Sequence, residues 1–172
     1  MANNREPCVP INRVRRRDRA VEDNEWIRAF LRDARYGVVA SESEGQPFTN
    51  PLLFVYDEGA NAIHFHTGRA GRIFANIAAN PRVCFNACRM GEPIADTEAW
   101  RFDVTYESVV VFGKATVMDE PQEATRALRL LLAKYFPHLR YGEDYVPIKP
   151  EQLARTAVYR LDIAAWSAKR NA

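Results

Sequence analysis

The spacing of hydrophobic residues changes from helical to strand-like near the start of the chain. Apolar residues from Trp26 to Leu31 recur at intervals of three and four, which predicts a helix over 23–35 capped by Asp23. The next stretch, "YGVVASESEGQPFTNPLLFVYDEGANAIHFH", predicts three strands separated by turns at "ESEGQ" and "DEGAN". An antiparallel meander is therefore expected after the first helix.

The middle of the chain predicts a short helix between strands. Residues 71–80 have a helical apolar face and end at an Asn-Pro pair, and "RVCFNAC" follows as a fourth strand. We expect a long loop over 89–101. The run "YESVVVFGKATVM" then predicts a long strand in which Gly113 marks a bulge or bend.

The last part predicts one long helix and a final strand. We expect Asp119 to cap the helix, Pro121 to lie in its first turn and Gln122 to complete a capping box. A loop over 137–150 then leads to the strand "TAVYRLDIAAW". Six strands, mostly in hairpins with helices inserted, favour a mainly β fold: a closed or half-open antiparallel barrel with peripheral helices. A doubly wound parallel sheet would need regular strand–helix alternation.

Length and composition are those of a soluble globular protein. The 172 residues, 47% hydrophobic and 27% charged, suit one domain over 21–172 preceded by an irregular basic arm over 1–20. The arm is either a solvated segment or one that folds over the domain and supplies an arginine to an anionic ligand. No aromatic residues are interleaved with its arginines, so a nucleic-acid tail is disfavoured.

The charge and the apolar runs argue against several classes of protein. A net charge of +2 gives no case for nucleic acid or acidic membranes as partners. No apolar run approaches the roughly 18 residues that a membrane helix needs, and the N-terminus has no apolar signal core. Three cysteines, an odd number, argue against a disulfide framework. We therefore expect a cytoplasmic protein.

A polar corner in "IHFHTGRAGRIFANIAANPRVCF" is the strongest candidate for a ligand site. The turn from Thr67 to Gly71 leads into the first turn of a predicted helix, where unpaired N–H groups attract anions. Arg69 and Arg72 are three residues apart, so we expect them to point roughly the same way. This set of groups suits a phosphate monoester. The alternative is a plain helix start with exposed arginines.

The neighbouring strand "GQPFTNPLLFVY" has Asn50-Pro51 in its middle. Proline cannot donate a ladder hydrogen bond, so this strand is expected at an edge, rim or bulge of the sheet. Unpaired backbone N–H and C=O groups at such a position can form hydrogen bonds with the edge of a flat heterocycle. The alternative is that Pro51 only protects a sheet edge.

The order of these motifs resembles the FMN-binding split-barrel proteins, which include the pyridoxamine 5′-phosphate oxidases. The resemblance rests on "G-x-P-x-x-x-P-L-x-F-V-Y-D", then "F-H-T-G-x-x-G-R", a helix and "N-P-R-V-C-F". "Y-E-S-V-V-V-F-G-K-A", "EATRALRLLLAKYFP" and "Y-R-L-D-I-A-A-W-S-A-K" fit the nitroimidazole-resistance (Nim) branch. The resemblance covers about residues 15 to 170. The family implies a six-stranded split barrel and a homodimer with one FMN at each subunit interface.

The resemblance also assigns roles to residues of this chain. The isoalloxazine would face the strand at Thr49, Asn50, Pro51 and Leu52. His66 and Thr67 would lie along the flavin and its ribityl chain, while Arg69, Gly71 and Arg72 would hold the phosphate. In the Nim branch the histidine at the position of His66 is associated with activity. We also expect Trp166 to stack near the flavin of the partner subunit.

This chain departs from the family at two of these places. Arg72 stands where the family usually has lysine, and an arginine still serves a phosphate. After Trp166 the chain has Ser167-Ala168-Lys169, where the branch often has a glycine before the lysine.

The two neighbouring histidines allow other interpretations. His64 and His66 are two apart on a strand, so both are expected on one side of it. A zinc site is disfavoured because no third ligand lies close by in the sequence, and no metal is expected. Either histidine could instead be a packing residue.

The resemblance implies an FMN-dependent oxidoreductase that reduces a small acceptor such as a nitroaromatic compound. The cofactor would carry the redox chemistry, and only His66 is a candidate catalytic residue. The alternatives are a flavin carrier or sensor without turnover, and the same barrel holding haem or a deazaflavin.

Overall fold

The computed structural model describes residues 10–172, so the predicted basic arm over 1–20 lies partly outside the described residues. Within residues 10–172 the strands are β1 (Ala20–Val21), β2 (Gly37–Ser43), β3 (Gln46–Leu52), β4 (Phe54–Asp57), β5 (Ala62–Gly68), β6 (Arg82–Ile94), β7 (Asp103–Val117) and β8 (Thr156–Asn171). The helices are α1 (Asn24–Asp33), α2 (Arg72–Ala79), α3 (Pro121–Tyr135), α4 (Pro150–Arg155) and the short 3-10 helices η1 (Arg17–Arg19) and η2 (Ala99–Arg101).

All eight strands of the described chain belong to one antiparallel sheet. Its order is β3-β2-β6-β7-β8-β5-β4, and β1 pairs with the far end of β8. The six predicted strands are all present, but the second is broken at Leu53 into β3 and β4, and β1 is additional. Leu53 separates strands that lie at opposite ends of the sheet order, so this break lets the chain cross from one edge to the other.

The sheet curls so that its two ends share a core. Phe54 on β4, at one end of the strand order, lies edge-on to Phe85 on β6 with ring centroids 4.7 Å apart. Phe65 and Tyr159 stack beside them, also at 4.7 Å. These side chains are fully buried in one cluster. The aromatic contact across the interior is what a half-open barrel requires, and a flat sheet could not make it.

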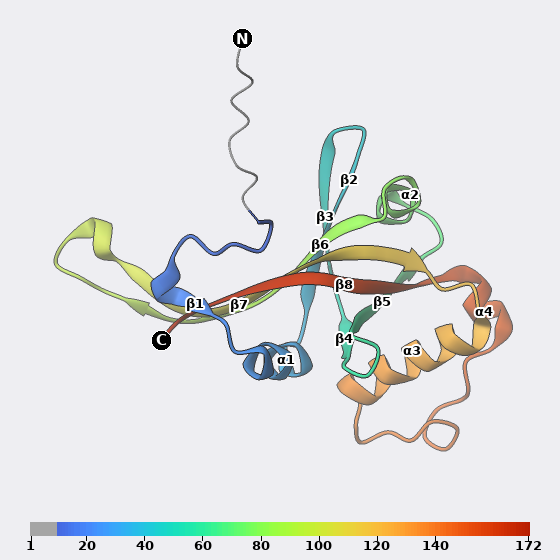
Figure 1. Cartoon of the computed structure of the whole chain (residues 1–172). Helices are drawn as coiled ribbons and strands as arrows, with labels where there is room; N and C mark the ends of the chain where they lie inside the picture. The colour runs from blue at the N-terminus through green and yellow to red at the C-terminus, as the bar shows by residue number, and fades with distance from the viewer. Residues whose placement is uncertain (1–9) are drawn as a thin grey trace, which may run out of the picture.

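The hairpin of β6 and β7 is longer than the sequence predicts. The expected loop over 89–101 is wrong in its first half, since β6 continues to Ile94 and pairs with β7 down to Asp103. A register shift between Met90 and Pro93 accommodates the proline without ending the strand. Figure 1 shows this hairpin reaching well beyond the rest of the sheet.

The bulge predicted at Gly113 is confirmed. The register of β7 against β8 shifts between Phe112 and Gly113. A Cβ at Gly113 would lie 2.1 Å from the carbonyl oxygen of Asp162, so only glycine allows this close approach of two backbones.

The N-terminal caps of the helices agree only in part with the predictions. The Asp23 carboxylate accepts hydrogen bonds from the backbone N–H groups of Glu25 and Trp26, so the cap of α1 is confirmed. The predicted capping box of α3 is wrong: Glu120 is the cap residue and makes no side-chain hydrogen bond there. Pro121 opens the helix, and its fixed φ and missing N–H reduce the need for a cap. Helix α4 was not predicted.

The described part of the basic arm packs against the domain through ion pairs. Val14 is buried, and Arg19 pairs with Asp103 on β7. Arg16 and Arg17 pair with Asp18 and Glu22, so these arginines are engaged by the chain itself. These contacts do not involve Arg13 or Arg15, so the interpretation in which the arm supplies an arginine to a ligand stays a prediction.

Among residues 10–172, the helices are all too short or too polar to span a lipid bilayer.

Candidate functional site

The turn between β5 and α2 forms the predicted corner, which we call the α2 corner (residues 67–72 with the facing edge strand β3). Gly71 is the cap residue of α2 and has φ 99°, a left-handed conformation that favours glycine. It offers no side-chain cap, so the N–H groups of the first turn of α2 have no side-chain partner at the cap. These amides, with Arg72 beside them, form a cationic helix start.

Strand β3 is an edge strand, as its proline predicts. It pairs only with β2 among the described strands. Thr49 and Pro51 are exposed on one face, whereas Asn50 and Leu52 are half-buried on the other. The Arg72 guanidinium lies 5.5 Å from the centre of the Phe48 ring, so α2 is attached to this strand by a cation–π contact.

Arg69 faces away from Arg72. Its backbone N–H donates to the carbonyl of Arg155 at 3.2 Å, and its Nε donates to the carbonyl of Thr156 at 3.2 Å. The expectation that the two arginines point the same way is therefore wrong. Arg69 lies in the turn before the helix begins, so the helical spacing that aligns residues three apart does not apply to it.

His66 and Thr67 point to opposite faces of β5, as successive residues of a strand must. The Thr67 hydroxyl lies 3.1 Å from that of Tyr159 and donates to the carbonyl of Gly68. His66 is on the other face, exposed but bordering a small apolar pocket of about 230 Å³ against α3. Partial desolvation of the ring where it borders this pocket lowers the pKa of His66, which favours its neutral imidazole.

His64 shares the face of His66 but has a different environment. It is 1% exposed, and its Nε2 lies 3.5 Å from the carboxylate of Asp57. Arg126 on α3 pairs with the same carboxylate at 2.8 Å. Burial lowers the pKa of His64, while Arg126 helps to hold the pKa of Asp57 below its usual value against the opposing effect of burial. His64 is thus a packing residue under α3. No metal-binding cluster of His, Cys, Asp or Glu occurs in residues 10–172.

Trp166 lies far from the α2 corner of its own chain. His66 pairs in register with Val158, and Trp166 is eight residues further along β8, about 26 Å at about 3.3 Å per residue. Its indole N–H donates to Asn24 at 3.0 Å, and Arg28 lies over its ring at 5.7 Å. Trp166 therefore does not line the α2 corner of its own chain, and its stacking on a flavin of the partner subunit stays a prediction.

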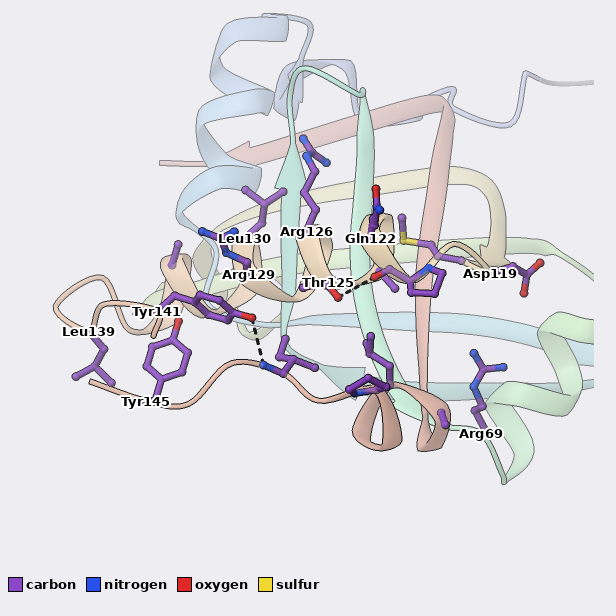
Figure 2. A pocket seen from close by; sticks show the side chains of 18 residues that line it. Arg69, Asp119, Gln122, Thr125, Arg126, Arg129, Leu130, Leu139, Tyr141 and Tyr145 are labelled. Carbon is purple, nitrogen blue, oxygen red and sulfur yellow. Dashed lines mark hydrogen bonds between the residues drawn. The ribbon is translucent and has the colours of Figure 1, made fainter. Parts of the chain in front are cut away.

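A larger pocket that the sequence did not indicate lies beside α3 (Figure 2). This α3 pocket has a volume of about 910 Å³ and is bounded by α3, the loop over 136–150 and α4, with Arg69 at one end. Arg129, Tyr141 and Tyr145 lie toward the other end. The only signal in the sequence was the pair of tyrosines in a loop expected to be irregular.

A pyridoxamine 5′-phosphate oxidase family model matches residues 23–170. The chain belongs to this family. The resemblance read from the motif order is thereby confirmed, together with the split-barrel fold. No curated protein matches the chain.

Several solved structures share this family's split barrel. A flavocytochrome from Azotobacter vinelandii is 23% identical with a TM-score of 0.80, covering 94% of this chain and 73% of that one. A putative 5-nitroimidazole antibiotic resistance protein from Bacteroides thetaiotaomicron is 18% identical with a TM-score of 0.73, covering 87% and 85%. An FAD and haem binding protein from Mycobacterium smegmatis is 17% identical with a TM-score of 0.80, covering 89% and 73%.

Proposed function

We propose that this chain binds FMN, with the phosphate at the first turn of α2. The observation that carries the proposal is the α2 corner itself: a glycine cap with positive φ, no side-chain cap, and Arg72 beside it. Such a helix start favours a phosphate through its amides and its dipole. The adjacent edge strand β3 has free backbone on the side away from β2, which suits a flat heterocycle.

The proposal includes a homodimer, because one chain builds only half of a flavin pocket. Thr49 and Pro51 on β3 and Gly71 at the start of α2 are exposed in the single chain, so the α2 corner is open. Val110 and Phe112 lie half-exposed on the outer face of β7 beside Cys84 of β6, an apolar surface suited to a second copy. Light scattering at micromolar concentration should give a dimer, and a monomer would contradict this part.

The proposed activity is reduction of a small acceptor, such as a nitroaromatic compound. A bound flavin would supply hydride and electron transfer. The chain would bind the phosphate through Arg72 and the amides after Gly71, and orient the ring along β3. His66, neutral and bordering an apolar pocket, would form one wall of the acceptor site and exclude water from it.

Haem is a second candidate, on one specific observation. His66 offers a neutral, exposed imidazole at the rim of an apolar pocket, which suits an axial ligand. The structures from Azotobacter vinelandii and Mycobacterium smegmatis are described as a flavocytochrome and an FAD and haem binding protein.

An absorption spectrum of the purified protein tests these proposals together. Two flavin bands are expected, and FMN released by heating should be distinguished from FAD by chromatography. A Soret band without flavin bands, or a single deazaflavin band, would overturn the FMN proposal. A yellow protein that neither accepts electrons from nicotinamide cofactors nor reduces nitro compounds would leave flavin binding intact and overturn the enzymatic part.

A further inference from the structure

The α3 pocket has walls that its own hydrogen bonds fix in place. The backbone N–H of Ile148 donates to the Tyr141 hydroxyl at 3.2 Å, drawn as a dashed line in Figure 2. The N–H of Gly142 donates to the carbonyl of Tyr145 at 2.9 Å, and the N–H of Arg140 donates to the carboxylate of Asp144 at 2.7 Å. A loop tied in this way keeps the cavity open without a ligand, which lowers the entropic cost of binding.

The lining of the pocket combines apolar surface with one cationic aromatic end. Leu130, Leu139, Ile148 and Leu153 contribute aliphatic surface. At one end the rings of Tyr141 and Tyr145 meet edge to face at 5.7 Å. This arrangement gives a ring-shaped ligand both a flat apolar wall and aromatic edges to contact.

The charges around the pocket favour a single negative group on the ligand. Arg129 lies 4.5 Å from the centre of the Tyr141 ring, and in residues 10–172 it has no acidic side chain within ion-pair distance. Arg126, one turn away, is engaged by Asp57. At the opposite end Asp119 and Arg69 both border the pocket, as Figure 2 shows, so their opposite charges leave no excess positive charge there for a second negative group.

From these observations we infer that the α3 pocket binds a small aromatic monocarboxylate, with its ring against Tyr141 and Tyr145 and its carboxylate on Arg129. The guanidinium edges remain available while its face rests on Tyr141, so a bidentate hydrogen bond is possible. This site shares only Arg69 with the α2 corner: it is otherwise built by α3, α4 and the segments beside them, and it does not depend on the proposed flavin.

The test is isothermal titration of the full-length protein, as purified, with 2-naphthoate. Affinity is expected on the order of 0.1 to 1 mM, ordinary for a ligand of this size. The neutral isostere 2-naphthamide should bind about tenfold more weakly or worse, because it lacks the charge-assisted contact. No heat with 2-naphthoate, or equal affinity for the amide, would overturn the inference.

Three variants locate the site. Arg129→Gln should weaken 2-naphthoate binding about tenfold, whereas Arg82→Gln, at an exposed arginine outside the pocket, should leave it unchanged. Ala133→Trp places a bulky side chain in the pocket at an exposed position and should abolish binding. Equal binding by Arg129→Gln and wild type would overturn the assignment, with circular dichroism confirming that each variant is folded.

Competition separates this site from the proposed flavin site. Saturating FMN should not displace 2-naphthoate, and the arginine dependence should be the same whether or not the protein binds flavin. Displacement by FMN would place the probe in the flavin pocket and overturn the inference while supporting flavin binding.

Discussion

The turn between β5 and α2 serves two regions that differ in how much of a binding site one chain provides. It directs Arg69 toward the α3 pocket and Arg72 toward β3. The α3 pocket is bounded by α3, α4 and their connecting loop, so a single chain forms its walls. The α2 corner has an exposed edge strand and no enclosing wall. A pocket bounded by one chain can bind a ligand in a monomer, whereas the open α2 corner would be completed by a second copy only if the proposed homodimer forms.

The two regions also depend on different parts of the core. Helix α3 packs on β4, β5 and β8, where Ala124 and Ala127 contact Val158. The Tyr135 hydroxyl bonds both to the N–H and to the carbonyl of Phe54. Helix α2 packs on β2 and β3, where the amide of Asn76 donates to the hydroxyl of Ser41. Figure 1 shows the two helices well apart. Substitutions can therefore disturb one region and leave the other intact.

The largest expected effect comes from Leu131→Ala. Leu131 is buried between α3 and the sheet, so its truncation should lower the free energy of unfolding by about 2–4 kcal/mol. It should loosen α3 and weaken 2-naphthoate binding, while FMN affinity measured on the folded protein stays the same. Urea unfolding and both titrations check this. Leu139→Ala, in the exposed loop that forms one wall of the α3 pocket, is the control and should lose less stability. If Leu131→Ala also lost FMN affinity, the two regions would be coupled.

The next largest effect concerns Arg72→Ala. It should weaken FMN binding by about 1.5–3 kcal/mol, the range for a hydrogen bond to a charged group. Arg69→Ala should have a smaller effect on FMN because its guanidinium is turned toward Thr156. Fluorescence titration measures both, with the exposed Arg82→Ala as a control for net charge. Unchanged FMN affinity in Arg72→Ala would remove the phosphate from the α2 corner.

The fold was more predictable than the site, for reasons visible in particular residues. Asp23, Pro51 and Gly113 act through local backbone chemistry, so the cap, the edge strand and the bulge could be inferred from the sequence. The directions of Arg69 and Arg72 depend on where the helix begins and on contacts with Thr156 and Phe48, which are distant in sequence. The α3 pocket depends on α4 and on hydrogen bonds within a loop, and neither has a periodic sequence pattern.

Acid should destabilise the contact between α3 and the sheet before it affects the α2 corner. Burial lowers the pKa of His64, so folding favours its neutral form, and this stability is lost as the pH falls from about 6.5, the unfolded value. The pKa of Asp57 is also lowered, and its contribution is lost only below about pH 4. Besides Asp57, Arg160 faces His64 across the β5–β8 pairing, and Arg126 of α3 pairs with the Asp57 carboxylate.

Between pH 7 and 5, His64 and His66 both contribute, because burial lowers the pKa of each. The free energy of unfolding should fall with a slope of at most about 1.4 kcal/mol per pH unit for each of the two histidines. Urea unfolding of wild type and His64→Leu over this range measures it. A slope that is the same in both proteins would show that His64 does not carry the effect.

The smallest expected effect on stability, and the sharpest test of role, comes from comparing the two histidines. His66→Ala should change the free energy of unfolding by no more than about 0.5 kcal/mol because the side chain is exposed. His64→Ala removes a buried side chain and should destabilise more, so it serves as the structural control.

If His66 borders the acceptor, its removal should change the nitroreductase rate per bound flavin about three- to tenfold. This corresponds to a change of less than about 1.4 kcal/mol in the activation free energy. FMN content, melting temperature and rate distinguish these roles, since a packing residue alters the first two and leaves the rate per flavin unchanged. Equal rates per bound flavin in wild type and His66→Ala would exclude His66 from the active site and leave the apolar pocket beside α3 as a packing feature.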